Sequence, residues 1–239
     1  MQYQTRQIGF GGGSVTPAVK GLLIVNVGVF ILQTVIGASL EQQLTFYFGL
    51  VPPLVLQNFY IWQLFTYQFL HGGLFHLLFN MLAVWMFGCD LERRWGSSFF
   101  LRYFFVTAIG GGFLNTVFLP TQMVPSIGAS AGVFGILLAY GLIYPNRTVY
   151  IYFLFPIKMK HFVWIIGGIA LYNSVASGQS GIAHLAHLGG MIFGYLYLRT
   201  GNPWLSFIHY LERRRLNRLK KRFQILPGGK DDDDGPTVH

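Results

Sequence analysis

The sequence predicts an all-α membrane protein built as a bundle of six transmembrane helices. The prediction depends on the apolar composition, on six apolar stretches and on basic residues confined to one side of them. Of the 239 residues, 53% are hydrophobic and only 10% are charged, and the mean hydropathy is +0.48. A soluble domain usually carries about a quarter charged residues. The low charge is expected of a chain that mostly contacts lipid.

Six apolar stretches account for most of the chain between residues 20 and 200. A transmembrane helix needs about 20 residues, with a range of about 17 to 25, so several of the stretches are short. Glycines and polar residues interrupt them, which is typical of helices that pack on one another. We predict crossings at 20–37, 73–89, 98–118, 129–144, 162–177 and 182–199.

The basic residues orient these crossings. All 17 Lys and Arg residues fall on one side of the six predicted helices. The connections on the other side, 40–72, 119–127 and 178–181, contain none. By the positive-inside rule the basic side is cytoplasmic, and both termini are therefore expected in the cytoplasm.

Three regions follow from this topology. Residues 1–19 form a cytoplasmic N-terminal tail without the features of a cleaved signal peptide, and residues 20–200 form the six-helix domain. Residues 201–239 form a cytoplasmic tail with a basic amphipathic helix over 203–223, which lies on an anionic inner leaflet or forms a solvated stem. The acidic run Asp231 to Asp234 at its end is expected to be disordered.

The first outer connection, 40–72, is unusually long and apolar. Its many aromatic residues favour the bilayer interface, so it is expected to lie half-immersed in the outer leaflet or to pack as a compact loop on the helix tops. The net charge of +9 does not indicate nucleic acid, because no basic stripe carries base-contacting elements. Cys89 is the single cysteine, which excludes an intrachain disulfide and a cysteine metal cluster.

Three predicted crossings carry polar side chains at a similar depth. Ser130 lies about two residues into the fourth helix, and His187 lies about five residues into the sixth. His76 and Asn80 lie about three and seven residues into the second. At 1.5 Å per residue, all four lie within roughly 3 to 11 Å of the outer rim. Strongly polar groups at membrane depth are costly and indicate a functional site.

Helical spacing groups these residues on common faces. His76 and Asn80 are four residues apart and share a face, as do His187, Gly190 and Gly194. The Gly-x-x-x-Gly spacing permits close approach of a neighbouring helix. We therefore expect the fourth and sixth helices to pack glycine to glycine, bringing His187 to Ser130.

This residue set suits nucleophilic catalysis. A serine hydroxyl is a weak nucleophile until an adjacent base takes its proton, and no carboxylate is expected at the depth of His187. The sequence thus predicts a Ser130–His187 dyad, with Phe134 stacked on the imidazole. His76, Asn80 and the backbone N–H of Ser130 would stabilise an oxyanion.

Structural explanations remain open for each of these residues. Ser130 would serve as a helix cap, His76 and Asn80 as partners in an interhelical hydrogen bond, and His187 as a structural histidine. A metal site is a further alternative, but it would lack thiolate and carboxylate ligands, and we predict no metal and no cofactor. The histidines it would use are His71, His76, His184 and His187.

Three motifs together resemble the rhomboid family of intramembrane serine proteases. They are His76-Leu-Leu-Phe-Asn80, Gly128-Ala-Ser130-Ala-Gly132 and Ala186-His187-Leu-Gly-Gly190, and the resemblance covers roughly residues 20–200. It implies that Ser130 is the nucleophile and His187 the base. His76, Asn80, Gly128 and Phe134 would belong to the oxyanion and substrate-binding region. Two positions depart from the family pattern: Ala131 follows the serine where glycine is usual, and Gln63 follows Trp62 where arginine is frequent.

The function implied is hydrolysis of peptide bonds in transmembrane protein substrates near the outer face of a plasma membrane, with a bacterial inner membrane expected. Two rival functions remain: a catalytically silent relative that binds client helices, and a small transporter. A transporter would show inverted repeats, and no internal repeat is evident. The physiological substrate and the oligomeric state are not set by the sequence.

Overall fold

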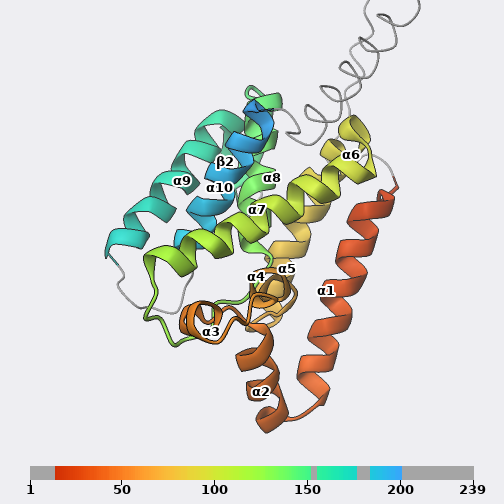
Figure 1. Ribbon diagram of the computed structural model, residues 1–239. Coiled ribbons are helices and arrows are strands. Elements are labelled where there is room, and N and C mark those ends of the chain that lie inside the picture. Colours follow the sequence, from red (N-terminus) through yellow and green to blue (C-terminus); the bar gives the residue numbers. More distant parts are fainter. Residues whose placement is uncertain (1–13, 152–154, 177–183, 201–239) are drawn as a thin grey trace, which may run out of the picture. The chain divides into compact units, whose positions relative to one another are not determined.

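The computed structural model describes residues 14–151, 155–176 and 184–200. These residues form helices and one two-stranded hairpin (Figure 1). The elements are α1 (Pro17–Val35), α2 (Ala38–Phe48), α3 (Pro52–Gln57), α4 (Gln63–Thr66), the 3₁₀ turn η1 (Tyr67–Phe69), α5 (Leu74–Ala83), the π-helical turn η2 (Val84–Gly88), α6 (Cys89–Trp95), α7 (Ser97–Phe118), α8 (Ser130–Ile143), β1 (Thr148–Ile151), β2 (Phe155–Lys158), α9 (Met159–Ala176) and α10 (His184–Arg199). The predicted tail helix 203–223 and the acidic end lie outside the described residues.

Three helices of the described part are long and apolar enough to cross a membrane: Pro17–Val35, Leu74–Trp95 and Ser97–Phe118. The helix α8 is apolar but shorter. The second of these helices runs through α5, η2 and α6 and continues six residues beyond the predicted end at Cys89, because the charged side chains of its last turns find partners inside the protein. It ends at Trp95, and the next residue, Gly96, has a φ of +79°, a left-handed conformation that glycine adopts readily.

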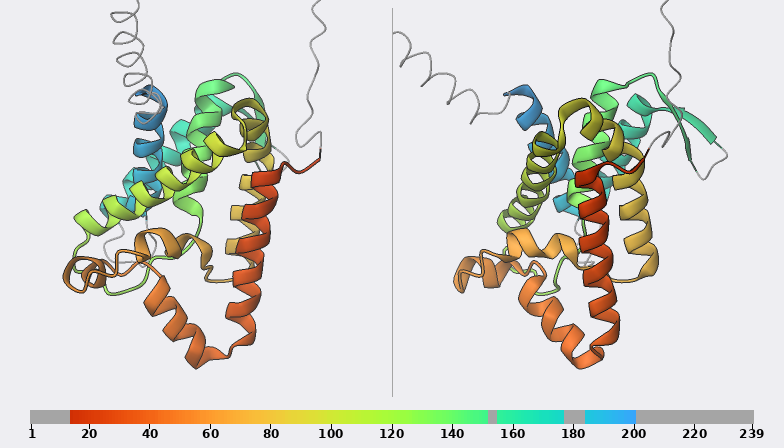
Figure 2. Two further views of the ribbon diagram at one scale, coloured as in Figure 1. Left: turned by 45° about the vertical axis from the view of Figure 1, so that its right-hand side comes forward. Right: turned by 90° about the vertical axis from the view of Figure 1, so that its right-hand side faces the viewer.

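The helix α8 is the centre of the bundle and contacts α5, α7, α9 and α10. Figures 1 and 2 show α7 crossing the bundle obliquely beside α8 and α10, while α1 stands alongside α5. The largest fully buried side chains in the core include Tyr103 and Phe104 of α7 and Ile136 and Tyr140 of α8. The helices α7 and α8 therefore pack on each other through large buried side chains, most of them aromatic.

Small residues set the distance between α10 and its neighbours. A Cβ atom at Gly190 would lie 2.1 Å from the backbone oxygen of Ala131, and one at Gly189 would lie 2.8 Å from the Cα of Gly111. The close contact between α8 and α10 thus joins a glycine to an alanine, and not two glycines as expected. Gly132 and Gly194 instead face the aromatic side chains of α7.

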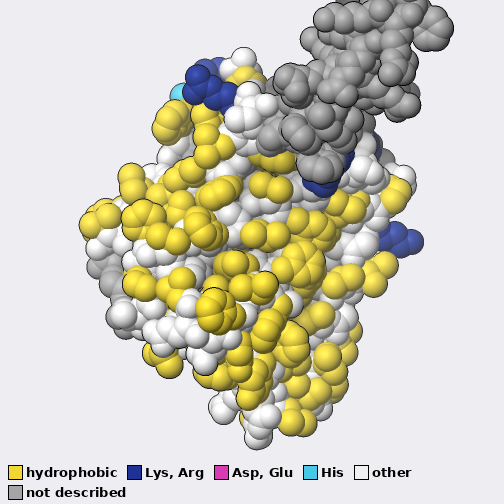
Figure 3. Space-filling view, in the orientation of Figure 1, with side chains coloured by type: hydrophobic (Ala, Val, Ile, Leu, Met, Phe, Trp, Pro, Cys, Tyr) yellow, Lys and Arg dark blue, Asp and Glu magenta, His cyan; other side chains and the backbone are white. Residues whose placement is uncertain are grey.

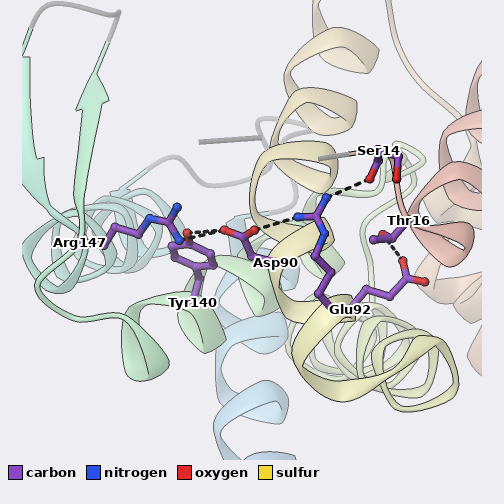
Figure 4. A network of polar contacts seen from close by, with 7 residues as sticks. Ser14, Thr16, Asp90, Glu92, Tyr140 and Arg147 are labelled. Atoms are coloured by element: carbon purple, nitrogen blue, oxygen red, sulfur yellow. Dashed lines mark hydrogen bonds and ion pairs between the residues drawn. The ribbon is translucent and has the colours of Figure 1, made fainter. Parts of the chain in front are cut away.

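At the end of the bundle where α6 meets α1, Glu92 joins two helix starts (Figure 4). Its carboxylate accepts hydrogen bonds from the hydroxyl of Thr16, from the N–H groups of Ala18 and Val19, both at 2.9 Å, and from the hydroxyl of Ser97 at 2.6 Å. The first N–H groups of a helix have no helical acceptor. Glu92 therefore caps α1 while holding the first residue of α7.

Asp90, two residues before Glu92, makes a second network in the same region (Figure 4). One carboxylate oxygen accepts from Arg93 at 3.0 Å, and the other accepts from the hydroxyl of Tyr140 and from Arg147, both at 2.9 Å. The network joins α6 to α8 and to the connection that follows α8. A buried carboxylate is tolerated when it is paired and hydrogen-bonded in this way.

The connection 145–161, for which the sequence predicts only a loop, contains the antiparallel hairpin β1–β2. Val149 pairs with Ile157 in its register, and both pack against the core. The alternation of inward Val149 with outward Thr148 and Tyr150 has the period of two that a half-buried strand requires.

The connection 40–72, which the sequence predicts on the outer side, is ordered into α2, α3, α4 and η1. It keeps large apolar side chains exposed, among them Phe59 at 75%. Gln63, which replaces the frequent arginine of the family, is fully buried. Its side chain donates to the carbonyl oxygens of Phe46 and Tyr47 at 3.0 and 3.3 Å and accepts from the N–H of Val51 at 2.9 Å. Glutamine thus holds this connection together without a charge.

The face seen in Figure 3 separates charge from apolar surface. Lys and Arg side chains show only in the upper half of this face, and a broad hydrophobic surface extends below them. Broad exposed apolar surfaces are rare on soluble monomers and are typical of proteins that contact lipid.

Candidate active site

Ser130 is the first residue of α8, and the loop before it is held by the connection 40–72. The N–H of Gly128 donates to the carbonyl oxygen of Tyr67 at 2.9 Å, and Ser126 forms an isolated β-bridge with Leu50. The hydroxyl of Tyr67 in turn donates to the carbonyl oxygen of Ala108 in α7 at 2.7 Å. The loop before α8 is therefore fixed by the connection 40–72, which is itself bonded to α7.

The hydroxyl of Ser130 and the imidazole of His187 are in direct contact. The distance between Ser130 Oγ and His187 Nε2 is 2.6 Å, although 57 residues separate them in the chain. His187 lies in the first turn of α10, and the Gly190–Ala131 contact one turn further along brings the two helix starts together. A hydroxyl bonded to an imidazole nitrogen is the arrangement that nucleophilic catalysis requires.

Phe134 lies one turn after Ser130 and stacks on His187. The ring centroids are 4.4 Å apart and the ring planes differ by 7°. His184 contacts the same imidazole edge-on, with centroids 6.0 Å apart. The histidine ring is therefore oriented by packing, since the hydrogen bonds of the described residues give it no carboxylate partner.

Gly128 lies against His76 and Asn80 of α5. A Cβ atom at Gly128 would lie 2.6 Å from both Cε1 and Nε2 of His76 and 3.7 Å from the side-chain nitrogen of Asn80. The φ angle of Gly128 is +119°, which side chains rarely allow. Glycine is thus required here both for the backbone conformation and for the space.

The donors around this position converge toward the start of α8. The N–H of Gly72 approaches Nδ1 of His76 at 3.4 Å, so Nε2, on the side of Gly128, carries the ring proton of the neutral imidazole. Asn80 donates to the carbonyl oxygen of His76 at 3.0 Å, and its amide nitrogen has a second hydrogen. Together with the N–H of Ser130, these groups can surround a developing negative charge.

His71 lies outside the predicted spans, immediately beside this cluster. It is only 2% exposed, and its ring meets that of His76 edge-on with centroids 5.0 Å apart. Burial and the neighbouring His76 lower the pKa of His71 to about 4. His71 is therefore neutral at physiological pH and adds no charge next to His76.

Ala131 departs from the family pattern, and its surroundings accommodate the extra methyl group. A Cβ atom at Gly111 of α7 would lie 2.7 Å from the Ala131 methyl. The methyl group therefore occupies a space left by Gly111, between α7 and α8. The glycine run 110–112 compensates for the alanine.

Two residues that shape the site were not predicted from the sequence. Tyr67 positions the loop before Ser130 through its backbone oxygen, and Gly111 makes room for α8 and α10. The run of three glycines inside an apolar helix could have indicated the close packing at Gly111. The role of Tyr67 depends on its backbone oxygen, which every residue has, so the sequence gives no sign of it. Among the described residues, no group of three or more His, Cys, Asp or Glu side chains is arranged to hold a metal ion.

Fold and site together define a class: helical proteins with membrane-spanning helices and a paired serine and histidine at two helix starts. The chain belongs to the rhomboid family, because the Rhomboid domain matches residues 58–202. It is 34% identical to Rhomboid protease GluP of Bacillus subtilis over 70% of this chain and 31% of that protein. It is 32% identical to RHOMBOID-like protein 4 of Arabidopsis thaliana, over 70% of this chain and 41% of that protein.

Rhomboid protease GlpG of Pectobacterium atrosepticum is 29% identical over 75% of this chain and 61% of that protein. The chain thus spans less than two thirds of the length of these relatives. Other relatives carry mitochondrial names, such as Rhomboid protein 1 of Saccharomyces cerevisiae, so the family is not confined to one membrane.

Proposed function

We propose that this protein is an intramembrane serine endopeptidase in which Ser130 attacks the peptide carbonyl and His187 takes its proton. The observation that carries the proposal is the 2.6 Å contact between Ser130 Oγ and His187 Nε2 in a chain of the rhomboid family. The protease names of the bacterial relatives support the same reaction.

The reaction follows from the positions of the groups. As Oγ bonds to the carbonyl carbon, its proton moves to Nε2 of His187, and the carbonyl oxygen becomes an oxyanion. The N–H of Ser130, with Asn80 and Nε2–H of His76, donates to that oxyanion; losing one such donor typically costs about 10² to 10³ in turnover. His187 then protonates the leaving amine, and water hydrolyses the acyl-enzyme.

The topology proposed for this reaction has six crossings with both termini in the cytoplasm. In this topology the starts of α8 and α10 lie just below the outer surface, and the substrate is a transmembrane segment cleaved near its outer end. The one-sided distribution of Lys and Arg supports the orientation. A bacterial plasma membrane is the proposed location.

Cleavage of a single-span model substrate by the purified full chain in liposomes tests the reaction. We expect Ser130→Ala and His187→Ala each to abolish cleavage, because each removes one member of the pair. Ser98→Ala and His161→Ala, at exposed positions, are the matched controls and should retain it.

Cleavage retained in Ser130→Ala would refute the assignment of Ser130 as the nucleophile. Cleavage retained in His187→Ala would refute the assignment of His187 as the base. A wild-type protein that binds the substrate but never cleaves it would favour the catalytically silent alternative.

A further inference from the structure

A groove separate from the serine site runs between α8, α9 and α10. Its volume is about 340 Å³, and its lining is apolar except for Lys160. Gly141 of α8 and Gly167 and Gly168 of α9 form part of its wall. Neither Ser130 nor His187 lines it. The groove therefore needs an explanation other than catalysis.

Small residues create the groove. At Gly141 the helices α8 and α9 are close, since a Cβ atom there would lie 2.6 Å from Val163. At Gly168 a Cβ atom would meet nothing within 4 Å, so this part of the wall is open. The rim is open to the surroundings, because Trp164 on α9 is 81% exposed. Figures 1 and 2 show α9 standing as the outermost helix of this side, next to α10.

The dimensions of the groove suit an acyl chain. Its lining runs along α9 from Lys160 to Leu171, which is roughly 16 Å at 1.5 Å per residue. One leaflet of a hydrocarbon core about 30 Å thick is about 15 Å deep. The length of the groove therefore matches that of an acyl chain within one leaflet.

The charges lie at one end of the groove only. Lys160, in the first turn of α9, is exposed and lines the groove. A second hollow shares Leu142 with it and is lined by Arg199 at the end of α10. No acidic side chain lines either hollow among the described residues. An ammonium and a guanidinium group that flank the mouth of an apolar groove complement the phosphate of a lipid headgroup.

We propose that this groove binds one anionic phospholipid, with an acyl chain along Gly167 and Gly168 and the phosphate at Lys160 and Arg199. Under the topology proposed above, the lipid belongs to the cytoplasmic leaflet. Binding itself does not depend on that orientation or on the protease reaction, because no residue of the serine site takes part.

Native mass spectrometry of the full chain in a mild detergent tests the proposal with added phosphatidylglycerol or phosphatidylcholine of identical acyl chains. We expect one tightly held phosphatidylglycerol per chain, bound at least tenfold more tightly than phosphatidylcholine. Gly168→Phe fills the groove and should lower that affinity at least tenfold. Lys160→Gln should remove the preference for the anionic headgroup.

Matched controls are available. Gly28→Phe places the same side chain at an exposed helical glycine of α1, where a Cβ atom also meets nothing within 4 Å, and Lys20→Gln removes a basic residue there. Both should bind as the wild type does. Gly168→Leu is the second groove variant, and circular dichroism confirms that each variant folds.

Two results overturn the proposal: wild-type lipid affinity in folded Gly168→Phe and Gly168→Leu, or equal affinity for the two headgroups in the wild type. Cleavage of the model substrate is measured in the same samples. Its absence from the wild type would count against the proposed function and leave the lipid result unaffected.

Discussion

At the residue scale, the candidate site depends on contacts between groups that are individually ordinary. Ser130 and His187 are half-buried, and each belongs to the first turn of its helix. The reactivity proposed for them depends on the 2.6 Å contact and on the ring of Phe134, which stacks on the imidazole. An aromatic pair of this kind contributes about 0.5–1.5 kcal/mol beyond its area. Packing thus replaces the carboxylate that orients the histidine in a triad.

Gly128 provides a test of the oxyanion region. In Gly128→Ala the new methyl group would lie 2.6 Å from the His76 ring on a backbone with a φ of +119°, so His76 or the loop must move. We expect turnover of the model substrate to fall at least about 10²-fold, the scale of losing one oxyanion donor, while the protein stays folded.

Gly73→Ala is the matched control, because a Cβ atom there meets nothing within 4 Å. It should keep near-wild-type turnover. Wild-type turnover in Gly128→Ala would show that this loop and His76 do not form the oxyanion region.

His71 makes a prediction about acid stability. Its pKa is lowered from 6.5 to about 4 in the folded protein, so the unfolded chain binds the proton more tightly. The resulting stability is fully present above pH 6.5 and is lost as the pH falls toward 4. The shift corresponds to about 3 kcal/mol at most.

The free energy of unfolding in detergent, measured at pH 7 and pH 4, checks this. We expect His71→Leu to lose less stability between these pH values than the wild type does, and His161→Leu, at an exposed site, to behave as the wild type. An identical loss in His71→Leu and the wild type would contradict the assignment.

At the element scale, close helix contacts carry the site. Ala131 packs its backbone against Gly190 of α10 and its methyl group against Gly111 of α7. These contacts leave no room for a larger side chain, so α8 and α10 have one relative position. The catalytic distance is therefore a property of the helix packing and not of Ser130 or His187 alone.

Gly190→Ala tests this dependence. A Cβ atom would lie 2.1 Å from the backbone oxygen of Ala131, and backbone cannot move as a side-chain tip does. We expect the two helices to separate, with a loss of about 1–3 kcal/mol in the free energy of unfolding and a marked loss of cleavage. Gly168→Ala, in open space, is the control; equal behaviour of the two variants would argue against a tight α8–α10 contact.

At the scale of the whole molecule, charge and apolar surface are separated. The Asp90 and Glu92 networks lie at the end of the bundle where the basic residues gather, and they join α1, α6, α7 and α8 there (Figure 4). Figure 3 shows the hydrophobic surface beyond that end. This separation supports the orientation proposed for the membrane.

Cysteine labelling tests the orientation. Cys89 is buried and can be replaced by alanine to give a cysteine-free background. We expect Gln57→Cys, at the end of α3, to react with an impermeant maleimide added to intact cells. Asn146→Cys, beside the hairpin, should react only after the membrane is opened. The reverse labelling pattern would show that the orientation of the protein in the membrane is opposite to the one proposed.

Much of the site could be predicted from the sequence, because it depends on local spacing. The shared face of His76 and Asn80 and the position of Phe134 one turn after Ser130 follow from the helical repeat. The three motifs that indicated the rhomboid family all lie within residues 58–202, the range that the Rhomboid domain matches. By contrast, the hairpin β1–β2 and the ordered connection 40–72 depend on contacts between separate segments, such as Gln63 with the carbonyl oxygens of Phe46 and Tyr47. The spacing of residues in the sequence does not reveal such contacts.

By itself, the sequence determined that the chain is a helical membrane protein and which residues could do chemistry, and it predicted that these residues lie at similar depths. Hydropathy and helical periodicity are local properties, and they suffice for these conclusions. Only the tertiary structure decided that Gly190 meets Ala131, that Gly111 receives the Ala131 methyl group, and that a groove opens beside Gly168. These contacts join residues that are far apart in the chain, and close packing of side-chain shapes selects them.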